Sequence, residues 1–271
     1  MRQQSKGSAL EWLARLGYSA RGIVYLIVGA LAVLDALGPT EESTDSKGAL
    51  EKLLTQPFGD FLLGVVALGL VGYSIWRFVQ AGWDVDNHGA DAKGLAIRGG
   101  LLVSAVTHVG LAVFALSLIF AWGTGNGDED QSTQDWTAWL LSQTLGQWLV
   151  GAVGVAMMGA GLAHAYKAWK IEFGKRFVMD RQTLKWVSPI CQFGLFARGI
   201  VFTIIGGFFI IAAVRFNSGE ARGLKGALEA LEVQPYGPIL LGIVALGLVA
   251  FGIYSFIEAG YRRVNHPKVK G

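Results

Sequence analysis

The chain has 271 residues, of which 52% are hydrophobic and only 16% are charged, and its mean hydropathy is +0.44. Because ordinary soluble domains carry about 25% charged residues, this composition excludes a typical water-soluble domain and indicates an integral membrane protein. The net charge of +3 does not indicate a nucleic-acid partner, since Lys and Arg are concentrated in alternate loops, a distribution that sets membrane orientation.

Six apolar segments follow one another along the chain, and each is long enough to cross about 30 Å of hydrocarbon as a helix of roughly 20 residues. Their approximate limits are 18–37, 58–79, 98–122, 145–169, 193–214 and 236–257. Backbone groups in lipid must be hydrogen-bonded within their own segment, and the alternation of a membrane β-barrel is absent. The predicted fold class is therefore all-α integral membrane, with six transmembrane helices.

The six helices are predicted to form three tandem helical hairpins, because their sequences repeat. The phrase Ala20-Arg21-Gly22 near the start of the first helix returns as Ile-Arg-Gly at 97–99 and as Ala-Arg-Gly at 197–199. The segments 47–51 and 66–71 return at 225–229 and 244–249 with one shared offset (225 − 47 = 178 and 244 − 66 = 178). Each repeat holds two spans, so all three share one orientation, and a pseudo-threefold arrangement is expected.

The repeats divide the chain into five parts. The predicted limits are 1–14 for a cytoplasmic N-terminal segment, 15–92 for the first two-helix repeat, 93–190 for the second, 191–262 for the third and 263–271 for a basic cytoplasmic tail. The second repeat is longer between its Arg and its Gln than the first (143 − 98 = 45 against 56 − 21 = 35). The excess is the acidic stretch 123–131, which is expected to be a solvated outer loop and lacks the ordered spacing of a calcium site.

A short helix and a turn are predicted between the two spans of each repeat. Apolar residues at helical spacing precede the turn at 49–54 and 227–231, which indicates an amphipathic helix on the outer surface. The turn has the pattern Gln-x-x-Gly at 56–59, 143–146 and 234–237. Pro57 and Pro235 are predicted to start the second helix of their repeats, because Pro fits the first helical turn.

These repeated phrases resemble the bacterial integral-membrane family called domain of unknown function 1206. The resemblance rests on the Ala-Arg-Gly helix start, the Lys-Gly-Ala-Leu phrase and the Gln-Pro-aromatic-Gly turn, and it covers about residues 15–262. It is weaker in the second repeat, where Thr144 replaces the Pro. The resemblance implies a six-helix protein of the bacterial cytoplasmic membrane and brings no known activity. The excess of Lys and Arg on one side predicts that both termini are cytoplasmic.

His108 is the leading candidate for a functional residue, because an ionisable side chain deep in a span costs at least ~2.5 kcal/mol without a partner. It lies ten residues into the third predicted span (108 − 98 = 10), with Ser104 one turn earlier and Thr107 adjacent. Two interpretations stay open. A neutral imidazole hydrogen-bonded to a neighbouring helix is favoured over a proton relay or a ligand contact.

His164 ends a stripe of small residues at 152, 156 and 160, which predicts that this face closely approaches another helix. Counted from the inner helix ends, His108 lies about 10 Å deeper than His164 at 1.5 Å per residue. The two are poorly placed to share a metal or a haem, so no metal and no cofactor are expected. The sequence also lacks a Ser-His-Asp set, zinc-ligand spacing and a phosphate loop, so the protein is not expected to be an enzyme.

Arg21, Arg98 and Arg198 occupy equivalent positions in the three repeats. Around a pseudo-threefold axis they would form an arginine ring at the inner face, able to attract anionic solutes or lipid headgroups. The favoured alternative is that each arginine extends to the interface and fixes the depth of its helix. Lys167 and Glu258 are also equivalent to one another, and Glu258 is a candidate for pairing with an arginine of a neighbouring repeat.

Two functions of different classes follow. The first is a small-solute or ion permease or channel whose candidate residues are Ser104, Thr107, His108, His164, Lys167 and Glu258. The second is a structural or interaction protein that organises lipids or partner membrane proteins. A polar, water-accessible cavity containing His108 would favour the first, and a dry, leucine-filled axis the second. Membrane lipids are the expected partners, and a homo-oligomer or a membrane-protein partner stays open.

Overall fold

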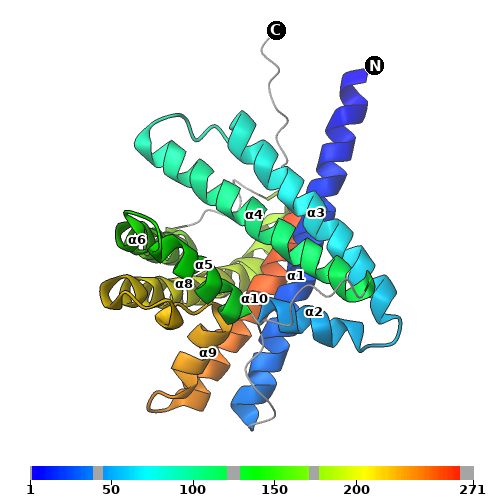
Figure 1. The fold of residues 1–271 in the computed structure, drawn as a ribbon. Helices are drawn as coiled ribbons and strands as arrows, with labels where there is room; N and C mark the ends of the chain where they lie inside the picture. The colour runs from blue at the N-terminus through cyan, green and yellow to red at the C-terminus, as the bar shows by residue number, and fades with distance from the viewer. Residues whose placement is uncertain (1, 39–44, 121–128, 171–176, 263–271) are drawn as a thin grey trace.

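The computed structural model describes residues 2–38, 45–120, 129–170 and 177–262. Within these ranges, six helices are long and apolar enough to cross a membrane, as predicted (Figure 1). They are α1 (Arg2–Leu37), α3 (Gly59–Trp83), α4 (Ala92–Phe120), α6 (Gly146–Lys170), α8 (Arg181–Arg215) and α10 (Gly237–Tyr261). Both α1 and α8 begin earlier than their predicted spans, so the expected boundaries at 14/15 and 190/191 lie inside continuous helices.

In each repeat, one short helix lies between the two spans. These short helices are α2 (Ser46–Leu54), α5 (Glu129–Leu141) and α9 (Leu224–Glu232), and the 3-10 helix η1 (Ser218–Glu220) precedes α9. Lys47 of α2 donates from Nζ to Ser132 Oγ of α5 at 2.6 Å, and Asp130 of α5 accepts from the Gly223 amide before α9 at 2.5 Å. All three short helices therefore meet at one end of the molecule, so the three hairpins point the same way. The predicted acidic loop 123–131 lies mostly outside the described residues.

The long helices pack in the order of the sequence, with one exception. Helix α1 packs against α3, α3 against α4, α6 against α8, α8 against α10, and α10 returns to α1. The two spans of the second repeat, α4 and α6, are not among the helix pairs that share a packing surface in the described chain. Figure 1 shows the result as three pairs, α3 with α4, α1 with α10, and α6 with α8. The second hairpin is thus divided between opposite ends of the row of helices.

The Gln-x-x-Gly turn contains the same backbone hydrogen bond in all three repeats. The amides of Gly59, Gly146 and Gly237 donate to the carbonyl of the Gln three residues earlier, at 2.9, 2.9 and 2.8 Å. A Cβ on Gly59 would lie 1.9 Å from the Leu54 oxygen, and one on Gly237 would lie 1.7 Å from the Glu232 oxygen. Only glycine fits these positions, because the short helix ends directly against the start of the long one.

The predicted role of the two prolines in this turn is wrong. Helices α3 and α10 begin at Gly59 and Gly237, two residues after Pro57 and Pro235. The intervening aromatic residue, Phe58 or Tyr236, has a left-handed backbone with φ of 61° or 63°. The chain reverses at this residue, so the proline lies in the turn and the helix can start only after the reversal.

The outward faces of the bundle are apolar, as contact with lipid requires. Large side chains such as Leu68, Val103 and Val155 are more than 60% exposed, although they lie in the middle of long helices. A soluble protein rarely exposes apolar surface on this scale. Together with the six spans, these faces identify the chain as a multi-pass membrane protein.

Candidate functional site

The first polar centre joins α1 to α3 and α10 through Arg21, which is only 2% exposed. Its Nη2 lies 2.6 Å from Glu258 Oε2, its Nε donates to Ser255 Oγ at 3.1 Å, and its Nη1 donates to Tyr73 Oη at 2.6 Å. All three guanidinium nitrogens are therefore bonded. The pairing predicted for Glu258 with an arginine of a neighbouring repeat is confirmed.

Arg262, just after α10, binds the second oxygen of the same carboxylate. Its Nη1 donates to Glu258 Oε1 at 2.7 Å and to Tyr18 Oη at 2.6 Å, and its Nη2 lies 3.4 Å from Asp86 Oδ2. Asp86 also accepts from Gln80 Nε2 at 2.7 Å. Glu258 thus sits between two arginines, and the loop after α3 supplies a second carboxylate.

That loop is shaped by Asp84, which ends α3 in a left-handed conformation with φ of 46°. Its carboxylate accepts from the backbone amides of Gly89 at 2.8 Å and His88 at 2.7 Å. These amides hold the pKa of Asp84 below its usual range, because they stabilise the ionised carboxylate. The bonds fold the loop back on itself and place Asp86 beside Arg262.

Arg77 of α3 reaches the same centre from another side. Its Nη1 donates to Gln80 Oε1 at 3.1 Å, its Nη2 donates to the Tyr73 hydroxyl, and its Cζ lies 4.7 Å from the centre of the Tyr73 ring. Its Nε is buried without a hydrogen-bond partner. We define the arginine network as the set of these residues: Tyr18, Arg21, Tyr73, Arg77, Gln80, Asp86, Ser255, Glu258 and Arg262.

Arg198 of α8 lies beside this network without joining its hydrogen bonds. Its Cζ is 4.5 Å from the centre of the Phe251 ring, and Arg21 Cζ is 5.0 Å from the centre of the same ring. Phe202 lies at 4.8 Å from Arg198 Cζ. The Nε of Arg198 is buried without a partner. Within the described part of the chain, neither Arg198 nor Arg77 forms an ion pair with a carboxylate.

His108 is buried next to the arginine network, at 8% exposure. Its ring centre lies 4.6 Å from that of Tyr73, and its Nδ1 donates to the Ser104 carbonyl at 2.7 Å. The favoured prediction of a hydrogen bond to a neighbouring helix is therefore wrong at this nitrogen, because the carbonyl one turn earlier on α4 is within reach. Thr107 is exposed, and its hydroxyl donates to the Val103 carbonyl of its own helix.

His164 lies where α6 meets α8. Its Nδ1 donates to the Ala160 carbonyl at 2.7 Å, and its ring packs edge-on against Phe202 with the centres 5.6 Å apart. The predicted contact stripe on α6 is wrong, since Ala152 and Ala156 are exposed. The close approach to α8 is made instead by Gly154 and Gly161, because glycine lets backbones come nearer than alanine does. Lys167, one turn after His164, is exposed.

Arg98 has a different role from its two counterparts. Its Nε donates to the Ala81 carbonyl at 2.6 Å and its Nη2 to the Gly82 carbonyl at 3.3 Å. These are carbonyls in the last turn of α3, where a cation also interacts favourably with the helix dipole. No contact in the described chain links Arg98 with Arg21 or Arg198. The structure thus brings two of the three predicted arginines to one aromatic ring and leaves the third at a helix end.

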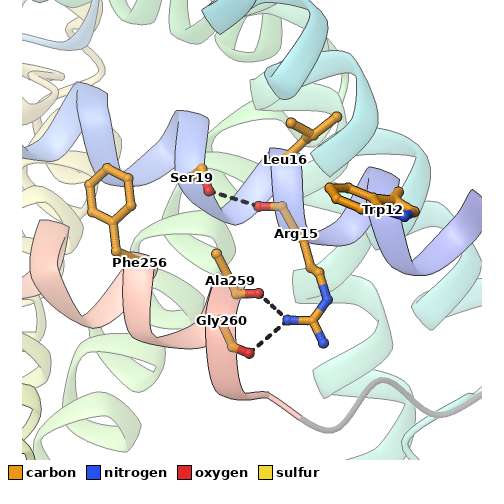
Figure 2. Close-up of a pocket in the computed structure, with 7 residues that line it drawn as sticks. All are labelled: Trp12, Arg15, Leu16, Ser19, Phe256, Ala259 and Gly260. Carbon is orange, nitrogen blue, oxygen red and sulfur yellow. Dashed lines mark hydrogen bonds between the residues drawn. The ribbon is translucent and has the colours of Figure 1, made fainter.

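A surface groove between α1 and α10 is lined by Trp12, Arg15, Leu16, Ser19, Phe256, Ala259 and Gly260. Figure 2 shows the Arg15 guanidinium turned toward the carbonyls of Ala259 and Gly260, to which it donates at 2.5 and 2.7 Å. Arg15 also pairs with Glu11 at 2.7 Å. The one charged side chain of the groove is therefore occupied in holding the end of α10 against α1.

Sequence reasoning missed Tyr18, Tyr73 and Asp86. The rule that selected His108, an ionisable group deep in an apolar span, applies equally to Arg77 and would have led to Tyr73 one turn earlier. Asp86 carries no comparable signal, because a carboxylate in a short loop is ordinary. Among the described residues, no three His, Cys, Asp or Glu side chains are grouped closely enough to hold a metal ion.

Comparison with known proteins matches the three repeats. A family model described as Domain of Unknown Function (DUF1206) matches residues 16–84, 99–170 and 193–262. The chain is similar to the Uncharacterized protein YxxB of Bacillus subtilis (strain 168), with 36% identity over 262 residues that cover 96% of this chain and 94% of the relative. No solved structure shows significant similarity.

Proposed function

The chain belongs to the family described as Domain of Unknown Function (DUF1206), whose description assigns no activity, and we propose that it is a non-enzymatic permease for small anions. One observation carries this proposal. Arg77 and Arg198 lie inside spans, and neither pairs with a carboxylate of the described chain. The Lys and Arg distribution supports placing the chain in the bacterial cytoplasmic membrane with both termini in the cytoplasm.

The charge count explains the choice of anions. Four arginines, Arg21, Arg77, Arg198 and Arg262, lie in or beside the arginine network, against the carboxylates Asp86 and Glu258, an excess of two positive charges (4 − 2 = 2). A guanidinium stays protonated at any physiological pH, so it cannot lose this charge. Aromatic contacts compensate such a cation by about 0.5–2 kcal/mol, less than the cost of placing it in a span. An entering anion would supply the remaining compensation of the positive charge.

The other half of the bundle is closed. Leu63 and Leu70 of α3, Leu228 of α9, and Leu241 and Leu248 of α10 are almost fully buried in one apolar cluster toward the end where the short helices meet. The side chains of this cluster are apolar, so they offer no polar contacts to an anion that leaves the arginine network in this direction. The proposal is accordingly a permease that changes conformation to open this half.

Anion flux into liposomes is the direct test. Purified protein is expected to move phosphate or acetate across phosphatidylcholine liposomes faster than protein-free liposomes allow. Arg77→Gln is expected to lower the rate by about tenfold, the effect of losing one charge-assisted hydrogen bond of roughly 1.5 kcal/mol. Arg215→Gln serves as the matched control, because Arg215 is 66% exposed and pairs only with Glu220 in the described chain. Equal flux with and without protein would reject the proposal.

A second function, a structural protein that organises lipids or membrane proteins, is favoured by the surroundings of His108. Its ring packs on Tyr73 and its Nδ1 is bonded to its own helix, as in a structural histidine. The leucine-filled half of the bundle also favours this structural function. Under this alternative, His108→Leu is expected to leave cell growth and anion flux unchanged, while lipids or proteins co-purify with the chain in fixed stoichiometry.

A further inference from the structure

Two helix interfaces in this protein are built to one plan. Where α1 meets α10, a Cβ on Gly22 would lie 3.1 Å from the Gly252 carbonyl oxygen. Where α8 meets α6, a Cβ on Gly199 would lie 2.8 Å from the Gly161 carbonyl oxygen. The residues of the two interfaces correspond at fixed offsets in the sequence. The offset from α1 to α8 is 177 (199 − 22), and the offset from α6 to α10 is 91 (252 − 161).

A second pair of contacts obeys the same offsets. A Cβ on Gly29 would lie 3.0 Å from the Ala245 oxygen, and one on Gly206 would lie 2.7 Å from the Gly154 oxygen. Here too, 206 − 29 = 177 and 245 − 154 = 91. The α6–α8 interface therefore reproduces the crossing point and register of the α1–α10 interface over two contacts seven residues apart.

The same offsets give the residues of the α6–α8 interface that correspond to Arg21 and its partners. Arg21 corresponds to Arg198 (198 − 21 = 177), and its partners Ser255 and Glu258 correspond to His164 and Lys167 (255 − 164 = 91 and 258 − 167 = 91). At the first interface the arginine meets a hydroxyl and a carboxylate. At the second, neither of the equivalent side chains is an anion.

The contacts of Arg198 agree with this mapping. Its Nε, which in Arg21 donates to Ser255, is buried without an acceptor. Arg198 and His164 lie against the same Phe202 ring, at 4.8 and 5.6 Å from its centre, so the two side chains share one wall of the interface. Aromatic contacts thus hold the Arg198 guanidinium in place. The described chain offers its Nε no acceptor such as Ser255, to which Arg21 Nε donates.

We propose that the α6–α8 interface binds an external oxyanion, a carboxylate or a phosphate group, on Arg198. This group would take the position that the Glu258 carboxylate holds beside Arg21, since the fork of a guanidinium matches either oxyanion with two parallel hydrogen bonds. The anion comes from a soluble solute or from a lipid headgroup. The inference rests on the proposed function in identifying this anion with the transported one, whereas binding itself requires no transport.

Binding is measured as the rise in melting temperature of the full-length protein in phosphatidylcholine nanodiscs, with phosphate or acetate titrated at constant ionic strength. Wild type is expected to show a saturable rise, because an anion that binds only the folded state stabilises it. Arg198→Gln is expected to raise the apparent Kd about 10- to 100-fold, the loss of a charge-assisted hydrogen bond. An unchanged Kd in Arg198→Gln would overturn the inference.

A second variant tests the site even if Arg198→Gln does not fold. Lys167→Glu places a tethered carboxylate where Glu258 stands in the first interface, so it is expected to raise the melting temperature without anion and to abolish the anion-dependent rise. Lys170→Glu reverses the charge of an exposed lysine on the same helix and is expected to keep the wild-type response. A full anion response in Lys167→Glu would contradict the proposed position.

Two further arms separate the possible sources and the two proposals. If the ligand is a lipid headgroup, nanodiscs containing phosphatidylglycerol will raise the melting temperature of wild type but not of Arg198→Gln, and soluble phosphate will add nothing. Binding without flux in liposomes would reject the permease and leave this site standing. Flux that Arg198→Gln leaves unchanged, together with an unchanged Kd in that variant, would reject the site and leave the permease.

Discussion

Replacing Glu258 with Gln is expected to lower the free energy of unfolding by about 3–5 kcal/mol, the loss found when one partner of a buried ion pair is removed. Each oxygen of the Glu258 carboxylate is paired with an arginine. Arg21 lies 2.6 Å from one oxygen, and Arg262 lies 2.7 Å from the other. An amide has no charge to offset either guanidinium. Unfolding of the purified protein in mixed micelles, followed by far-UV circular dichroism, measures the change.

The matched control is Glu220→Gln, which removes an ion pair of the same length, 2.6 Å, at an exposed position beside Arg215. It is expected to cost less than about 1 kcal/mol, because water screens and replaces such a pair. The double variant Arg21→Gln with Glu258→Gln is expected to be more stable than the sum of the two single losses predicts. Equal small losses in Glu258→Gln and Glu220→Gln would show that the buried pair is not the bond that holds α1 to α10.

Replacing Gly237 with Ala is expected to lower the free energy of unfolding by about 1–3 kcal/mol or more, the range for overpacking a tight site. The new Cβ would lie 1.7 Å from the Glu232 oxygen, which is backbone and cannot turn away as a side chain could. Relief requires α9 to separate from the start of α10. Thermal unfolding in detergent measures the effect.

Gly207→Ala provides the comparison for this variant. Gly207 lies within α8, and a Cβ there would meet nothing within 4 Å. Because Ala favours the helix over Gly by about 0.8–1.0 kcal/mol, this change is expected to be neutral or slightly stabilising. If Gly237→Ala were as stable as Gly207→Ala, the turn would not depend on the close contact between the short and long helices.

The sequence by itself determined the membrane class, the six spans and the three-repeat order, and it marked Glu258 as a candidate partner for an arginine. Each of these follows from information carried along the chain. Apolar length sets a span, and a constant offset between similar segments sets a repeat. The glycine of the Gln-x-x-Gly turn was visible as well, although its left-handed aromatic neighbour, Phe58 or Tyr236, was not.

Only the tertiary structure decided which helix faces meet. It separates α4 from α6, moves Arg98 to the end of α3, joins Tyr73 to Arg21, and replaces the expected alanine stripe of α6 with Gly154 and Gly161. The physical reason is that lipid tails are as apolar as a helix interface, so hydrophobicity does not distinguish a face that packs on protein from one that faces lipid. That choice depends on backbone approach and on buried polar contacts between segments far apart in sequence.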